Sequence, residues 1–120
     1  MSSEIIVYSF SKCSTCRRAI KWLEVNRIKY DLKDIVSTPP GEEILIKAIS
    51  QLGNRKLVFN TSGLSYRQLG AATIKAMSDS EALEALNSDG KLIKRPFLVY
   101  NKSKVLVGFK EEIWSKVLLS

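Results

Sequence analysis

A β-α-β unit at the start of the chain constrains the fold most strongly. Residues 4–10, EIIVYSF, form a short and almost unbroken apolar run, which is typical of a strand buried on both faces of a sheet. Apolar side chains then recur at helical spacing from Cys16 to Leu23, which predicts an amphipathic helix. Between residues 28 and 32 apolar and charged residues alternate, which indicates a second strand. Strands joined through a helix in this way are expected to be parallel.

The middle of the chain is expected to be mostly helical. Residues 39–41, Pro-Pro-Gly, precede an apolar stripe at helical spacing that ends at Gly53, a residue suited to ending a helix. Residues 54–64 show no period and are expected to form a loop, followed by a short helical piece at 66–69. Residues 78–81, Ser-Asp-Ser-Glu, have the pattern of a capping box, so another helix should begin there.

The last third of the chain predicts a strand pair and a final helix. Strands are expected at 97–100 and 105–107, and the polar turn between them is short enough for a hairpin. An apolar face of Ile113, Trp114, Val117 and Leu118 predicts the last helix. The order β-α-β, helices, β-β-α predicts an α/β, thioredoxin-like fold. It has a four-stranded mixed sheet and a helical insertion, at about residues 40–91, between the second and third strands. We expect residues 1–120 to form one domain.

Charge and apolar content narrow the classes of function. No apolar stretch approaches the roughly 18–20 residues that a membrane span needs, and the first residues lack the pattern of a secretory signal. We therefore expect a cytoplasmic protein with reduced thiols. The net charge of +7 is spread over both halves of the chain. This favours a basic soluble surface over nonspecific attraction to nucleic acid, and we expect no direct nucleic-acid or membrane partner.

Two cysteines stand where the first strand passes into the first helix. Cys13 lies in the turn, and Cys16 lies on the apolar stripe of the helix. The unpaired N–H groups and positive dipole of a first helical turn favour a thiolate, and Arg17 and Arg18 add positive charge. The pKa of Cys13 should therefore lie below the free value of about 8.5. Spacing i, i+3 lets Cys16 resolve an adduct on Cys13 as a disulfide, so Cys13 is the expected nucleophile and Cys16 the resolving thiol.

Other interpretations of the thiol pair remain open. Both cysteines could be core residues by chance, and Cys16 alone could be a packing residue. A zinc site needs about four ligands, whereas this chain has two thiols and no histidine, so we expect no metal. The absence of histidine also excludes a Cys-His or Ser-His dyad.

Arg95 and Pro96 precede the third strand. In thioredoxin-like folds a cis-proline at this point lies beside the nucleophilic cysteine; alternatively, Pro96 merely begins the strand. Arg95 is either a solvated neighbour of Lys94 or lies beside Cys13. There its planar guanidinium would bind an oxyanion or a glutathione carboxylate, and we favour this second interpretation.

Four segments carry a family resemblance: residues 12–19, KCSTCRRA; 66–70, YRQLG; 94–99, KRPFLV; and 107–111, VGFKE. Together they resemble the arsenate reductase/Spx family of bacterial proteins over essentially the whole chain. The resemblance is closest to arsenate-reductase-like members that have a C-x-x-C, and it implies the thioredoxin-like fold with a helical insert.

The reductase branch implies one set of site residues. Its members use one cysteine at the position of Cys13, rely on glutathione and glutaredoxin, and hold arsenate with three arginines. Arg95 matches one arginine, a second falls near Lys56 (next to Arg55), and the third falls near Val107, where this chain has no cation. The expected catalytic residues are Cys13, Cys16 and Arg95, and the expected substrate-binding residues are Lys12, Arg17, Lys56 and Pro96. Cys16 stands where those enzymes usually have serine.

The Spx branch implies a different function. Its members carry a C-x-x-C that switches between dithiol and disulfide, bind the α subunit of RNA polymerase and redirect transcription. The first expectation is therefore a thiol oxidoreductase acting on a small oxyanion such as arsenate, or on an oxidised thiol. It would have no bound cofactor and would use glutathione, glutaredoxin or a thioredoxin-type protein as external reductant. The alternative is a redox-switched transcriptional regulator, and a third is a family member whose disulfide forms only under stress.

Overall fold

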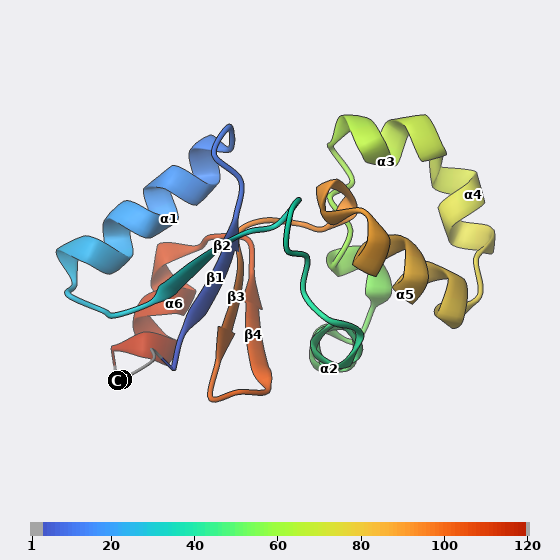
Figure 1. Cartoon of the computed structure of the whole chain (residues 1–120). Coiled ribbons are helices and arrows are strands. Elements are labelled where there is room, and N and C mark those ends of the chain that lie inside the picture. Colours follow the sequence, from blue (N-terminus) through green and yellow to red (C-terminus); the bar gives the residue numbers. More distant parts are fainter. Residues whose placement is uncertain (1–3, 120) are drawn as a thin grey trace.

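The computed structural model describes residues 4–119 and contains a four-stranded mixed sheet (Figure 1). The strands are β1 (Ile6–Ser9), β2 (Asp31–Asp34), β3 (Phe97–Tyr100) and β4 (Lys104–Val107). Their order is β2-β1-β3-β4, with β1 and β2 parallel and β3 antiparallel to both β1 and β4. The helices are α1 (Ser14–Val25), α2 (Glu42–Leu52), α3 (Leu64–Leu69), α4 (Ala71–Ala76), α5 (Asp79–Ser88) and α6 (Glu111–Leu118), with 3-10 turns at Arg55–Leu57 and Gly90–Leu92. The predicted α/β class and mixed sheet are confirmed.

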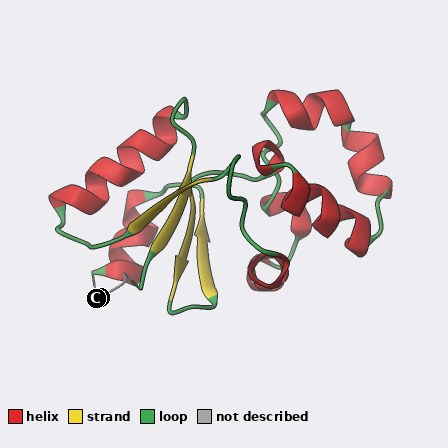
Figure 2. Ribbon diagram, viewed as in Figure 1, coloured by secondary structure: helices red, strands yellow, loops and turns green. Residues whose placement is uncertain are grey.

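Helices α1 and α6 cover one face of the sheet, and α2 to α5 lie on the other side (Figure 2). An aromatic contact joins α1 to α6, because the Trp22 and Trp114 rings meet edge to face with centroids 6.0 Å apart. The indole nitrogen of Trp114, a side chain that is 1% exposed, donates to the Gly108 carbonyl oxygen at 3.2 Å. This packing fixes the end of β4 against the last helix, close to the start of α1.

The second core lies between the sheet and the helices of the insertion. Sheet residues Tyr8 and Phe97 contribute to it, together with Phe59 and Leu86 from the insertion. The buried backbone of Gly90 approaches the end of β2 so closely that a Cβ atom there would lie 1.8 Å from the Ile35 carbonyl oxygen. Only glycine fits this contact, which joins the insertion to the sheet.

Helix α2 also lies beside β4, the outer strand on this side. The Gln51 side chain donates to the Ser103 carbonyl oxygen at 2.6 Å and accepts from the Val105 N–H at 3.0 Å. One side-chain amide thus satisfies two backbone groups near the outer strand. No helix within residues 4–119 has the length and apolarity required to cross a membrane.

Local sequence signals predicted the end of α2 and the start of α5 correctly. Gly53 ends α2 in the left-handed conformation with φ 77°, and Ser78 and Glu81 form the predicted capping box of α5. The second strand begins at Asp31, not at residue 28, because its parallel ladder with β1 starts at the pair Ile6 and Asp31. The expected loop at 54–64 contains a 3-10 turn, and α4 had no predicted counterpart.

Candidate active site

Cys13 is the N-cap residue of α1, directly after β1 and a tight turn. Its backbone N–H donates to the Phe10 carbonyl oxygen at 3.0 Å, and its Sγ accepts the Cys16 N–H at 3.2 Å. The sulfur thus takes the place of the oxygen that usually caps a helix. Cys13 is partly exposed, whereas Cys16 is 0% exposed, as their positions in the sequence predicted.

The two thiols differ in acidity because their surroundings differ. Burial acts to raise the pKa of Cys13, but hydrogen bonds from Cys16 and from the Arg95 guanidinium, with its positive charge, lower it below the ordinary value. Burial raises the pKa of Cys16 to about 11, and the neighbouring Cys13 contributes to the rise. Cys13 therefore forms a thiolate at lower pH than Cys16, which keeps its proton until well above neutral pH.

Arg95 lies just before β3, where it contacts Phe10 and is followed by a cis peptide bond. Its guanidinium carbon lies 4.8 Å from the centroid of the Phe10 ring, within the range of a cation–π contact. The Arg95-Pro96 peptide bond is cis, and the Pro96 carbonyl oxygen accepts the Gly108 N–H at 2.8 Å. Arg95 lies beside Cys13, as one of the two sequence interpretations expected, and Pro96 is buried.

A cavity of about 570 Å³ opens around Cys13, and we call it the Cys13 basin. Five cationic side chains line it: Lys12, Arg18, Lys94, Arg95 and Lys110. Asn60, Ser62 and Phe109 also contribute, and no acidic residue among those described lines the basin. Such a concentration of positive charge in a concave site attracts anions.

The basin contains only some of the residues predicted from the sequence. Lys12 lines it with Cys13 and Arg95, but the guanidinium of Arg17 turns to the Ser11 carbonyl oxygen at 2.8 Å. Lys56, expected near the substrate from the family resemblance, lines a different cavity within the insertion.

Sequence reasoning used Arg18 only as positive charge near Cys13, and it missed two further cations of the basin, Lys94 and Lys110. Lys94 and Lys110 belong to the segments that carried the family resemblance. Membership in these segments was the one sequence signal that could have identified the two lysines as site residues. The spacing of isolated lysines does not distinguish a binding site from a solvated surface.

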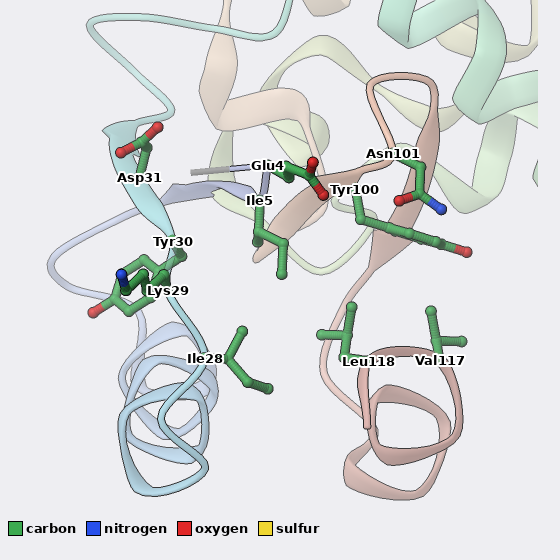
Figure 3. A pocket seen from close by; sticks show the side chains of 10 residues that line it. All are labelled: Glu4, Ile5, Ile28, Lys29, Tyr30, Asp31, Tyr100, Asn101, Val117 and Leu118. Carbon is green, nitrogen blue, oxygen red and sulfur yellow. The ribbon is translucent and has the colours of Figure 1, made fainter. Parts of the chain in front are cut away.

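A larger cavity, of about 860 Å³, is lined by residues other than those of the Cys13 basin, and Figure 3 shows its lining side chains. It is lined by residues that precede β1 and β2, by the β3 end and by the end of α6, and in the figure Ile5, Ile28 and Leu118 point toward its centre. None of its lining residues is a cysteine, an arginine or a member of the Cys13 basin. The candidate active site is therefore identified by the reactive thiol and the arginines that line it, not by the volume of the cavity.

Curated relatives match the chain over most of its length. YusI of Bacillus subtilis strain 168 is 45% identical over 107 residues, which cover 88% of this chain and 90% of YusI. The regulatory protein MgsR of the same organism is 30% identical over 111 residues, covering 91% of this chain and 86% of MgsR. The global transcriptional regulator Spx of Lactiplantibacillus plantarum is 27% identical over 110 residues, covering 90% of this chain and 81% of Spx.

Solved structures show the same fold. A protein of Streptococcus mutans UA159, described as a possible arsenate reductase, has a TM-score of 0.83 and 39% identity, covering 91% of this chain and 93% of that one. The arsenate reductase of Vibrio cholerae has a TM-score of 0.74 at 24% identity, covering 99% and 98% of the two chains. The sequence model of the ArsC family matches residues 8–117, so the chain belongs to the ArsC family.

Proposed function

We propose that this chain is a thiol-based oxidoreductase in which Cys13 is the nucleophile and Cys16 the resolving thiol. One observation carries the proposal: two hydrogen-bonded thiols at a helix N-terminus differ in acidity, with the lower pKa on the partly exposed Cys13. A nucleophile must be ionised and accessible, whereas a resolving thiol can stay protonated until it is needed. Arg95, beside Cys13, is proposed to stabilise negative charge that develops on the substrate.

The proposed reaction begins when the Cys13 thiolate attacks arsenic in arsenate, or one sulfur of a disulfide. The new bond to Cys13 Sγ forms as hydroxide, or a thiolate, leaves. A second thiol then loses its proton and attacks Cys13 Sγ, and arsenite, or for a disulfide the second thiolate, leaves with the electron pair. Two thiols become one disulfide while arsenic(V) becomes arsenic(III), and an external thiol such as glutathione, or glutaredoxin, restores the starting state.

Formation of the adduct prepares Cys16 for the second step. The neighbouring Cys13 is one of the causes that raise the pKa of Cys16. Once Cys13 Sγ is covalently bound, its negative charge is gone, so the pKa of Cys16 should fall. The resolving thiol is thus activated by the adduct that it must release.

The Cys13 basin supports an anionic substrate. Arsenate carries one to two negative charges near neutral pH, and five cations line the basin without an opposing carboxylate among the described residues. Val107, at the position of the third family arginine, also lines the basin, and Lys94 and Lys110 lie beside it there. We propose that these lysines supply the charge that the missing arginine would have supplied.

The test is arsenate-dependent oxidation of NADPH in the presence of glutaredoxin, glutathione and glutathione reductase. Wild type should turn over and Cys13→Ser should not, because serine at this position is not ionised. Cys16→Ser should keep activity if an external thiol resolves the adduct and lose it if Cys16 does. Equal turnover by wild type and Cys13→Ser would refute the role of Cys13.

A second candidate function is a redox-switched transcriptional regulator that binds the RNA polymerase α subunit. It is favoured by the similarity to MgsR and Spx, whose names describe regulators. In this case the thiol pair is a switch and the insertion helices provide the docking surface. A pull-down with immobilised α subunit, with and without dithiothreitol, tests it: binding that changes with the reductant supports the switch, and no binding in either state contradicts it.

A further inference from the structure

The helical insertion encloses a second cavity, of about 350 Å³, that shares no lining residue with the Cys13 basin. We call it the insert cavity. Its lining residues are Asn54, Arg55, Lys56, Phe59, Tyr66, Ala71, Ile74 and Lys75. The volume lies within the range of about 300–1,000 Å³ that is typical of sites for small molecules.

The insert cavity is held open by the geometry of α3 and α4. These two short helices meet at Gly70, whose φ of 96° lets the chain turn sharply between them. Arg55 braces the far side, because its guanidinium donates to the Met77 carbonyl oxygen at 2.6 Å and to the Ile74 carbonyl oxygen at 3.1 Å. The same guanidinium pairs with Asp79 at 3.0 Å. The Arg55 guanidinium is thus occupied by contacts within the protein, and its hydrogen bonds hold the C-terminal end of α4.

Buried, mainly apolar side chains form the floor of the insert cavity. Phe59 is 1% exposed, Ile74 5% and Tyr66 9%, and the Phe59 and Tyr66 rings meet edge to face with centroids 6.1 Å apart. A flat or branched hydrocarbon body is the chemistry that such a floor accepts.

The rim of the insert cavity is cationic. Lys56 and Lys75 are exposed at its edge, and neither has an ion-pair partner among residues 4–119. No acidic side chain of the described residues lines this cavity. An apolar floor beneath two unpaired ammonium groups is complementary to an amphipathic anion.

We propose that the insert cavity binds a small carboxylate with one ring-sized apolar body. The apolar body lies on Phe59, Tyr66 and Ile74, and the carboxylate faces Lys56 and Lys75. This assignment gives Lys56 a role where the structure places it, in the insertion and not in the Cys13 basin. It requires no reaction at Cys13, so it stands independently of the proposed redox activity.

The experiment uses phenylacetate as the probe and the full chain labelled with ¹⁵N. Titration followed by amide chemical shifts should give saturable changes concentrated at residues 54–59 and 64–76. Phenylacetamide, which has the same ring without the charge, should bind at least about tenfold more weakly, and acetate, which lacks the ring, should cause no saturable change there. Changes confined to the Cys13 basin would overturn the proposal, as would equal binding of phenylacetate and phenylacetamide.

Matched variants locate the site. Ala71→Phe places a ring in the insert cavity and should abolish saturable binding, whereas Ala72→Phe, also on an exposed position of α4 but outside the lining, should leave it unchanged. Lys56→Gln should weaken binding about five- to tenfold, and Lys47→Gln, an exposed lysine on α2, should not. Unchanged binding by Ala71→Phe, or equal loss in both lysine variants, would refute the site.

Discussion

Iodoacetamide should alkylate Cys13 at least about tenfold faster than Cys16 in the folded, reduced protein at pH 7. A thiol with a pKa of 9.0 is ionised in about 1 molecule in 100 at this pH, and the pKa of Cys13 lies below that value. Cys16, with a pKa of about 11, is ionised in about 1 molecule in 10⁴. The more basic Cys16 thiolate is intrinsically the better nucleophile, and this reduces the roughly hundredfold advantage of Cys13 to about tenfold. Burial of Cys16 then increases the remaining ratio further.

The assay is a time course of alkylation with each cysteine quantified by peptide mass spectrometry. Repeated at several pH values, the rate at Cys13 should reach half of its maximum below pH 9, whereas the rate at Cys16 should reach half of its maximum only near pH 11. In concentrated urea the two rates should come within about threefold, because unfolding removes the surroundings that separate them. Equal rates in the folded protein, or faster labelling of Cys16, would refute the assignment of nucleophile and resolving thiol.

Three further predictions concern charge and packing. Between pH 9 and 11 the free energy of unfolding should fall by about 2–3 kcal/mol more in wild type than in Cys16→Ala, measured by urea denaturation. The reason is that folded Cys16 keeps its proton to about pH 11, whereas the unfolded chain loses it near pH 8.5, so rising pH favours unfolding. Gly90→Ala should lower the free energy of unfolding by more than about 2 kcal/mol, since its Cβ would lie 1.8 Å from a carbonyl oxygen. The control Gly41→Ala should change the free energy of unfolding by less than about 1 kcal/mol, because nothing lies within 4 Å of a Cβ at that position. The ratio of the alkylation rate by iodoacetate to that by iodoacetamide should be a fewfold higher at Cys13 than for free cysteine, because the basin attracts the negatively charged reagent. An unchanged ratio in 1 M salt or in Lys110→Gln would contradict an electrostatic role for the basin.

The sheet and the positions of the two thiols were predicted well from the sequence because both follow from local patterns. The apolar run before Cys13 and the stripe beginning at Cys16 place the pair at a strand-to-helix junction, and that junction determines which thiol is exposed. The insertion was harder to predict, because its helices are short and their packing depends on distant contacts such as that of Gly90 with Ile35. The position of Lys56 was inferred by aligning it with a family arginine, and its place in the insert cavity is set by the 3-10 turn that the sequence pattern did not reveal.

The Gln51 amide beside β4 has a consequence for self-association. An outer strand with free backbone groups is a template on which another chain can add, and the two outer strands of this sheet are protected by different means. The Gln51 side chain occupies the Val105 N–H and the Ser103 carbonyl near β4, whereas β2 relies on charge, because three of its four residues are Asp or Lys. Salt screens charges and leaves a hydrogen bond in place, so aggregation at high ionic strength should begin at β2 and spread from that side of the molecule.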